Sequence, residues 1–134
     1  MLPARYGVVL TFGLLSLWSK PSIPAKGNLE AGRNAFLSRC MSCHAVACNK
    51  TGPKLQGLFG RPAGTLADFP NFTDALKASG IVWDAAKLDQ FLADPPKMVP
   101  GTWMWVGKVE DARERRALIA YLLAADTSAD ICQR

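Results

Sequence analysis

Cys40 and Cys43 are separated by two residues and are followed at once by His44, the only histidine of the chain. At the end of a helix, this spacing lets both thiols reach the two vinyl groups of one porphyrin while the adjacent imidazole turns under the iron. C-x-x-C-H is the sequence for covalent haem attachment. The chain is therefore expected to fold around one haem c, bonded to Cys40 and Cys43, with His44 ligating its iron.

Two other kinds of site use closely spaced cysteines. A redox-active dithiol begins a helix after a strand, whereas no strand is expected ahead of Cys40. A zinc site could recruit Cys40, Cys43, His44 and Cys48, but His44 adjoins Cys43 and no second pair of ligands follows. Haem attachment is the favoured interpretation.

Apolar periodicity and capping residues predict four helices joined by long loops. The expected helices span residues 28–40, 73–79, 84–93 and 110–125, and Pro95-Pro96 is expected to stop the third. Residues 47–72 are rich in Gly and Pro and are expected to form loops and turns, which cannot bury a core of their own. A large apolar cofactor gives such a segment something to surround. The predicted fold class is all-α.

Size and charge limit the function. A chain of 134 residues has room for one domain, and its formal charge of +5 is spread along the sequence. Nucleic acid is not expected as a partner, because no basic stripe with interleaved aromatic residues is present.

The first 25 residues have the pattern of a signal peptide. A basic start at 1–5 precedes an apolar run at 7–18, and small Ala25 marks the expected cleavage site. The run is shorter than the ~20 residues that a membrane-spanning helix needs, so an uncleaved anchor facing the periplasm is the weaker alternative. We expect a periplasmic domain at 26–134, which meets the membrane only through partner complexes or an uncleaved leader.

The iron needs a sixth ligand or an open site. Methionine is the available candidate, at Met41, Met98 or Met104. Spacing alone leaves the choice open, because a methionine at an irregular position more often fills a gap in the core.

Several short segments resemble the class I cytochromes c, close to mitochondrial cytochrome c and its bacterial relatives, over nearly all of 28–125. The matching residues are Gly32, Phe36, Gly52-Pro53-Lys54-Leu55, Gly57-Leu58-Phe59-Gly60-Arg61, Phe72-Thr73-Asp74-Ala75, Gly80-Ile81-Val82-Trp83, Val99-Pro100-Gly101-Thr102-Trp103-Met104 and Leu118-Ile119-Ala120-Tyr121-Leu122. The resemblance implies the cytochrome c fold, with about four helices around one haem.

The resemblance also implies roles for single residues. It makes His44 and Met104 the axial ligands and Met98 a packing residue. The carbonyl of Pro53 would accept a hydrogen bond from His44, which orients the ring. Three further residues match positions around the haem propionates: Arg61, Trp83 and Thr102. Gly32 and Tyr121 match the contact where the first and last helices cross.

Departures from the family concern the surroundings of the haem. Mitochondrial members have tyrosines where Phe72 and Phe91 stand, and an asparagine where Leu76 stands, so this side should be more apolar. The ring of lysines around the haem edge is thin. Its expected remnants are Arg39, Lys54, Lys97 and Lys108. Trp103 and Trp105 flank Met104 and could shape a docking surface, but such residues more often cover the haem, which is the expectation here.

Cys48 and Cys132 have no role in the family pattern. In an oxidising compartment two leftover thiols tend to pair. The family fold brings the loop after the histidine near the C-terminal helix, so a disulfide between them is expected.

The expected function is that of a monomeric electron carrier, not an enzyme, that meets donor and acceptor proteins transiently. The alternative is a haem enzyme or gas-binding protein with an open iron site. That alternative usually needs a distal proton-handling residue, and no second histidine exists for the role.

Overall fold

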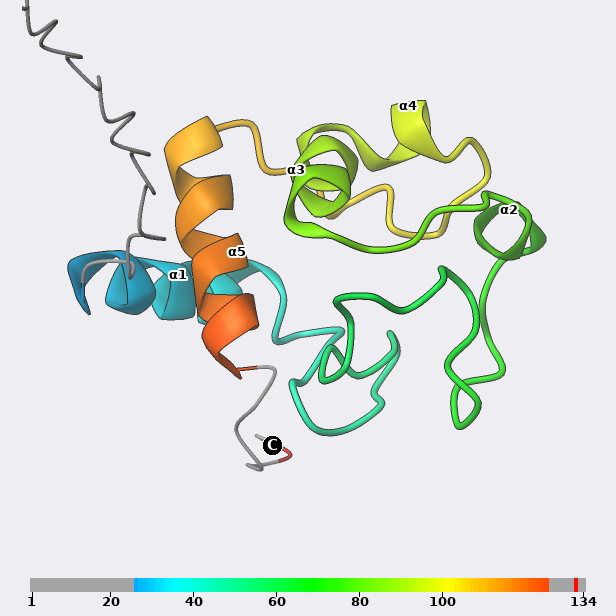
Figure 1. The fold of residues 1–134 in the computed structure, drawn as a ribbon, viewed down its shortest axis with the longest axis horizontal. Helices are drawn as coiled ribbons and strands as arrows, with labels where there is room; N and C mark the ends of the chain where they lie inside the picture. Colours follow the sequence, from blue (N-terminus) through cyan, green and yellow to red (C-terminus); the bar gives the residue numbers. More distant parts are fainter. Residues whose placement is uncertain (1–25, 126–131, 133–134) are drawn as a thin grey trace, which may run out of the picture.

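The computed structural model describes residues 26–125 and 132. Five helices are present there, in the order α1 (Lys26–Arg39), α2 (Asp74–Lys77), α3 (Ala85–Ala93), α4 (Pro95–Met98) and α5 (Ala112–Ala125) (Figure 1). Within these residues the only β contact is an isolated antiparallel bridge between Pro62 and Val82. The all-α prediction is confirmed. None of the described helices is long and apolar enough to cross a membrane. The predicted leader at 1–25 lies outside the described residues.

The first and last helices cross each other closely (Figure 1). A Cβ atom added to Gly32 of α1 would lie 2.6 Å from the carbonyl carbon of Ala117 and 2.7 Å from Cβ of Tyr121 on α5. No side chain fits in that space. The rings of Phe36 and Tyr121 pack beside the crossing, with centroids 5.6 Å apart. The expected contact of Gly32 with Tyr121 is confirmed. It fixes how α1 and α5 cross, and the loops pack against these two helices.

Side-chain caps explain where three helices begin. The carboxylate of Asp84 accepts from the backbone N–H of Lys87, which starts α3 where the sequence predicted. Thr73 caps α2 in the same way. Asp111 accepts from two backbone N–H groups at the start of α5, and these bonds hold the pKa of Asp111 below its usual range. Helix α5 therefore begins at Ala112 rather than at residue 110.

Helix α4 was not predicted. The pair Pro95-Pro96 was interpreted only as the stop of the preceding helix, but Pro95 begins a further helix. Proline suits the first turn, because the N–H that it lacks has no partner inside the helix there. The carboxylate of Asp94 accepts from the backbone N–H of Lys97 and caps this turn. The short helix carries the chain to the loop that contains Met104.

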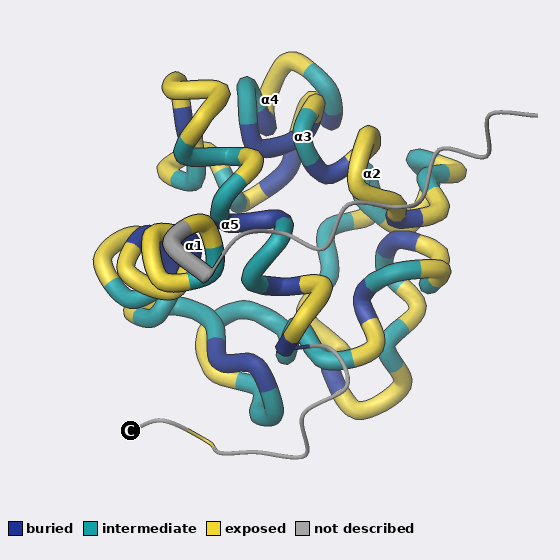
Figure 2. The backbone as a smooth tube through the Cα atoms, turned by 60° about the vertical axis from the view of Figure 1, so that its left-hand side comes forward, coloured by how far each residue is buried: buried dark blue, intermediate teal, exposed yellow. Residues whose placement is uncertain are grey.

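The core lies between the inner faces of α1, α3 and α5. Its members include Phe36, Leu88, Leu92, Leu118 and Leu122, which are all buried. Figure 2 shows this pattern, with buried positions on the inner sides of the helices and scattered along the loops. The long segment after α1, from 40 to 73, contains no helix. As predicted, it is built of turns, and it closes one side of a cavity beside the core.

Candidate functional site

A cavity of about 480 Å³ lies beside the core and is lined mainly by apolar side chains. All eight residues that the sequence predicted for the site line it: Cys40, Cys43, His44, Pro53, Arg61, Trp83, Thr102 and Met104. Five of them come from the segment 40–73 that follows α1, Trp83 comes directly before α3, and Thr102 and Met104 come after α4. The structure therefore brings distant parts of the chain around one apolar space.

The two cysteines follow the last turn of α1. The N–H of Cys40 donates to the carbonyl of Phe36 at 2.9 Å, and the N–H of His44 donates to the carbonyl of Cys40 at 2.8 Å. These bonds wind Cys40, Cys43 and His44 into one tight turn on the wall of the cavity. Burial raises the pKa of the Cys40 thiol to about 11. A reactive dithiol needs a lowered pKa, so this environment does not favour the dithiol alternative.

His44 is held in one orientation from two sides. Its Nδ1 lies 2.7 Å from the carbonyl oxygen of Pro53. Because a carbonyl can only accept, the proton sits on Nδ1, which leaves the lone pair of Nε2 free for a metal. Gly52 lies against the ring, since a Cβ there would be 2.7 Å from Nε2.

The electrostatics of His44 suit a metal ligand. Burial lowers the pKa of His44 below its usual value, the bond to Pro53 opposes this shift, and the charge of Lys50 adds to it. The neutral ring is the form that ligates iron. The expected hydrogen bond from His44 to Pro53 is present in the structure.

Met104 is the only one of the three candidate methionines that lines the cavity. Met41 and Met98 are partly buried and pack against the core. The N–H of Met104 donates to the hydroxyl of Thr102 at 3.2 Å, and the carbonyl of Met104 accepts from the N–H of Gly107 at 3.2 Å. Of the three candidates, the path of the loop thus brings only Met104 to the cavity.

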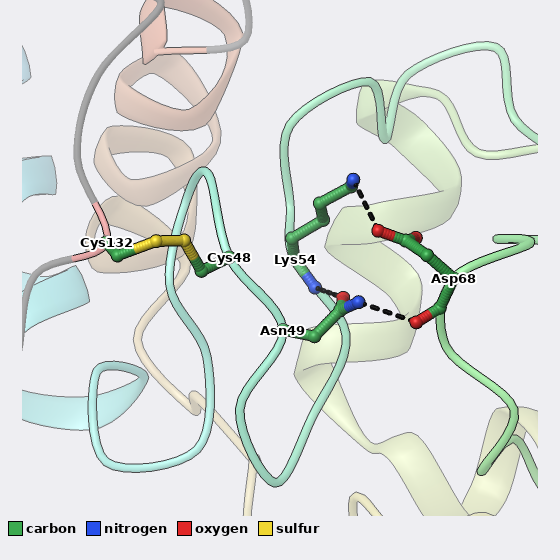
Figure 3. The surroundings of a disulfide bond; sticks show 5 residues. All are labelled: Cys48, Asn49, Lys54, Asp68 and Cys132. Atoms are coloured by element: carbon green, nitrogen blue, oxygen red, sulfur yellow. Dashed lines mark hydrogen bonds and ion pairs between the residues drawn. A yellow bond between two sulfur atoms is a disulfide. The ribbon is translucent and has the colours of Figure 1, made fainter.

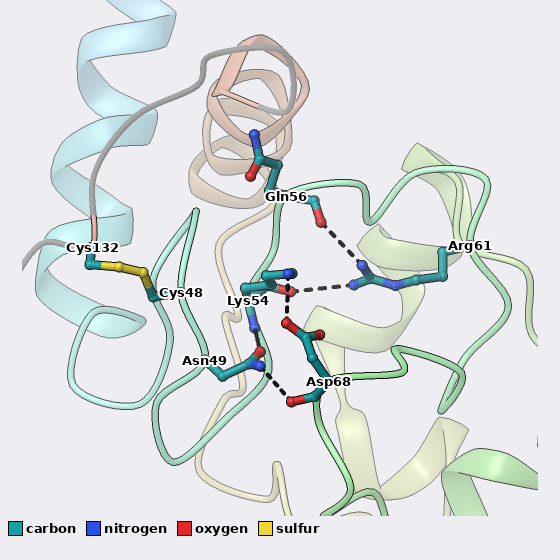
Figure 4. Close-up of polar contacts among 7 residues, drawn as sticks. All are labelled: Cys48, Asn49, Lys54, Gln56, Arg61, Asp68 and Cys132. Atoms are coloured by element: carbon teal, nitrogen blue, oxygen red, sulfur yellow. Dashed lines mark hydrogen bonds and ion pairs between the residues drawn. A yellow bond between two sulfur atoms is a disulfide. The ribbon is translucent and has the colours of Figure 1, made fainter.

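Arg61 has polar surroundings, whereas those of Trp83 are apolar. The guanidinium of Arg61 donates to the carbonyls of Gln56 at 3.1 Å and Lys54 at 3.3 Å (Figure 4). Trp83 is buried, and its ring lies edge-on to that of Phe91, with centroids 5.2 Å apart. Phe91 brings no hydroxyl to this wall, as the sequence indicated.

A polar cluster of Asn49, Lys54 and Asp68 was not predicted (Figure 3). The amide of Asn49 accepts from the N–H of Lys54 at 2.9 Å and donates to the carbonyl of Asp68 at 2.8 Å. The ammonium of Lys54 lies 2.7 Å from the carboxylate of Asp68, and this bond lowers the pKa of Asp68. Asparagine in a Gly/Pro-rich loop is a known turn signal, but its distant partner is not readable from sequence.

Most of the expected ring of free cations is neutralised. Arg39 lies 2.6 Å from Glu114, and Lys108 lies 3.1 Å from Glu110. Lys54 pairs with Asp68 as described above. The pairing of Arg39 raises its pKa, first through the hydrogen bond to Glu114. Positive charge is therefore largely compensated around the cavity.

Cys48 and Cys132 lie side by side, with Cα atoms 5.2 Å apart and their sulfur atoms joined (Figure 3). That separation is within the usual range for a disulfide. Within 26–125 and 132, no three His, Cys, Asp or Glu side chains gather in a way that could hold a metal ion. The zinc alternative, which needed Cys48 as a ligand, therefore has no support in the geometry.

The expectation that Trp103 and Trp105 both cover the site is wrong for Trp105. Trp105 is 69% exposed and does not line the cavity. Trp103 reaches the rim and is 71% exposed. Trp105, next to the inward Met104, thus faces solvent, whereas Trp103 lies at the rim of the cavity.

Comparison with known proteins gives consistent matches. The sequence model of the family described as Cytochrome c matches residues 29–126. The chain is 43% identical over 101 residues to cytochrome c of Gibberella zeae, covering 73% of this chain and 94% of that one. It is 45% identical over 98 residues to cytochrome c2 of Rhodoplanes tepidamans, covering 71% and 90%. The solved structure of cytochrome cH from Methylobacterium extorquens matches with a TM-score of 0.67 and 46% identity, over 72% of this chain and 97% of that one.

Proposed function

This chain belongs to the cytochrome c family, holds one covalently bound haem c and is a monohaem electron carrier, and we propose that His44 and Met104 ligate its iron. The observation that carries the proposal is the lining of the cavity. One wall holds a histidine whose Nδ1 is already engaged, and Met104 is the single candidate methionine that reaches the same space.

The protein's own residues attach the haem, orient the His44 ring and exclude water from the site. Thioether bonds from Cys40 and Cys43 hold the group permanently. Pro53 and Gly52 keep the His44 ring in one orientation, so Nε2 need not be reorganised when the charge changes. The haem iron supplies a one-electron couple between the ferric and ferrous states. His/Met ligation in an apolar cavity favours the ferrous state and a fairly high potential.

We further propose roles for Arg61, Trp83 and Thr102 around the haem propionates. Arg61 is held at the cavity wall by backbone carbonyls. The buried hydroxyl of Thr102 accepts from the N–H of Met104 and ties this part of the wall to the methionine. Because these groups are preorganised, they can stabilise negative charge with little rearrangement.

Covalent attachment is tested by extraction. The chain is expressed with a c-type haem maturation system in a host that exports proteins, and the product is treated with acid acetone. We expect the haem to stay with the polypeptide and to extract freely when Cys40 and Cys43 are both changed to serine. A wild-type protein that releases its haem would contradict the proposal.

Iron ligation is tested by a matched pair of methionine variants. Met104→Ala should lose the absorption band of methionine bound to ferric iron and should lower the potential. Met98→Ala, which removes a partly buried methionine outside the cavity, should keep six-coordinate low-spin iron. The reversed result would assign the ligand to Met98. A high-spin wild-type spectrum would favour the enzyme or gas-binding alternative.

We also propose that residues 1–25 are a signal peptide and that the domain works in the periplasm with transient redox partners. A mature chain that begins at Lys26, found in the periplasmic fraction, is the expected result. Full-length chain recovered from washed membranes would instead indicate an anchor.

A disulfide between Cys48 and Cys132 is part of the same proposal, because the compartment is oxidising. The 5.2 Å between their Cα atoms supports it. Native protein that is alkylated without reductant should gain no alkyl groups on these residues by intact mass. Two alkylated cysteines would contradict the disulfide.

A further inference from the structure

Large exposed apolar side chains gather beside the methionine. Of the five in the described part of the chain, three lie within four consecutive residues: Trp103, Trp105 and Val106, at 71%, 69% and 68% exposure. We call these three residues the apolar patch. Trp103 and Val106 also line the cavity, so the patch is continuous with the haem site.

The geometry of the loop explains why the patch faces outward. Met104 is partly buried and lines the cavity, and its neighbours on both sides are exposed. Short hydrogen-bonded turns hold this arrangement, from Met104 N–H to Thr102 and from Gly107 N–H to the Met104 carbonyl. The outward tryptophans are therefore a consequence of directing the methionine inward.

Charge around the site does not supply a docking force of its own. Arg39, Lys54 and Lys108 each pair with a carboxylate of this chain, at 2.6, 2.7 and 3.1 Å. Of the four cations predicted for the rim, only Lys97 has no ion pair among the described residues. A rim whose charges are paired within the chain does not steer a charged partner strongly. It is compatible with a partner whose contact surface is uncharged.

The size of the patch distinguishes a transient partner from a stable one. An aromatic side chain offers about 150–250 Å², so the two tryptophans present at most about 300 Å² to a partner, part of Trp103 being turned to the cavity. A stable interface uses about 800 Å² on each side, whereas redox encounters fall below that size. The patch suffices for a brief encounter and is too small for a lasting dimer.

We propose that the apolar patch docks the uncharged, apolar face of an electron-transfer protein, so that docking depends on apolar contact rather than on charge. The proposal rests on the proposed function, because only a protein that exchanges electrons needs a partner at this rim. It assigns Trp103 and Trp105 as the anchors of the encounter.

The test uses the holoprotein on gold electrodes coated with alkanethiols. One monolayer mixes methyl and hydroxyl ends and stands in for an uncharged apolar face, and the other ends in carboxylates. Cyclic voltammetry measures how much redox-active protein binds at ionic strengths from about 0.01 M to 1 M, over which the screening length falls from about 30 Å to 3 Å. Binding to the methyl surface should change less than about twofold over this range, since no charge attraction is being screened.

The variant Trp103→Gln/Trp105→Gln should bind the methyl surface at least about tenfold more weakly, as expected for loss of central aromatic anchors. Leu123→Gln is the matched control, because Leu123 is an exposed apolar residue of α5 outside the cavity. It should bind as the wild type does. Trp105→Gln alone, at a residue outside the cavity, should also bind the methyl surface more weakly while it keeps the potential and the methionine band of the wild type, which separates docking from folding.

Three results would overturn the docking proposal. They are equal binding by the double variant, binding that falls with salt, and preference for the carboxylate surface. Self-association of the wild type in sedimentation, lost in the double variant, would assign the patch to a second copy instead. Binding to phosphatidylcholine vesicles, lost in the same variant, would assign it to a lipid surface. A wild type without a reversible couple would contradict the proposed function, whereas a normal couple with unchanged binding contradicts only the docking.

Discussion

The two sides of the haem site are built in contrasting ways. The attachment segment, residues 40–72, is bonded across itself many times, whereas the methionine loop, residues 99–109, is held mainly by bonds between near neighbours. In the attachment segment Gly52 donates to Cys43 at 2.7 Å, and Gln56 donates to Val46 at 2.8 Å. The polar cluster and the pairing of Cys48 with Cys132 add further ties (Figure 4).

The methionine loop has few such ties. Thr102, Met104 and Gly107 donate to partners two or three residues away. Bonds to other elements are found only at its two ends, where Val99 donates to Pro95 of α4 at 2.9 Å and where Val109 donates to Leu92 at 2.8 Å and accepts from Arg115 of α5 at 2.9 Å. The attachment segment, which contains His44, is therefore a rigid support. The methionine loop is lightly held and also presents the apolar patch.

The largest expected effect comes from removing the bridge on the rigid side. With Cys48 and Cys132 both changed to serine, the free energy of unfolding should fall by about 4 kcal/mol, because the bridge closes a loop with a sequence separation of 84. Guanidinium denaturation measures the change. Cys48→Ser alone should cost the same, and the methionine band should persist in both. Unchanged stability would mean that the rigid side does not depend on the bridge.

A pair of glycine variants compares the two sides directly. Gly52→Ala places a Cβ 2.7 Å from Nε2 of His44, which is fixed by Pro53, so it should cost about 1–3 kcal/mol and perturb the haem spectrum. Gly107→Ala places a Cβ 2.6 Å from the terminal methyl of Met104, but the loop there is held by bonds between near neighbours and can shift to make room. Gly107→Ala should therefore lower the free energy of unfolding by less than Gly52→Ala does, as measured by thermal denaturation of both variants. Equal costs would contradict the contrast in rigidity.

Hydrogen exchange sharpens the same comparison without mutation. The amide of Gln56, bonded across the attachment segment to Val46, should exchange at least about tenfold more slowly than that of Gly107, bonded within its loop to Met104. NMR of the reduced protein resolves both amides. Faster exchange at Gln56 would show that the bonds across the attachment segment do not restrain it.

The smallest expected effect concerns the ion pair of Lys54 with Asp68. The hydrogen bond from Lys54 holds the pKa of Asp68 below its usual value, so its stabilising contribution is present above the ordinary aspartate pKa and is lost as the pH falls through the lowered value. Asp68→Asn should therefore lower the melting temperature slightly at pH 7 and not at all at pH 2. High salt should shrink the difference. A penalty that persists at pH 2 would contradict this assignment.

Local sequence determined the features that depend on near neighbours. Asp84 and Lys87 lie three residues apart, so the start of α3 could be predicted from the sequence. The turn of Cys40, Cys43 and His44 is equally local and specified the cofactor. The class of fold followed from the same short-range signals. The wrong interpretation of Pro95 was local too, because proline both ends one helix and begins another.

Only the tertiary structure decided features that join distant segments. Spacing could not choose between Met98 and Met104, and only the family resemblance favoured Met104, because which methionine lines the cavity depends on the path of the loop beyond α4. The partner of Lys54 lies 14 residues away, beyond the range of any turn rule. The outward direction of Trp105 likewise follows from the inward direction of Met104. Such contacts form when loops pack against a common core, and no single segment carries that information.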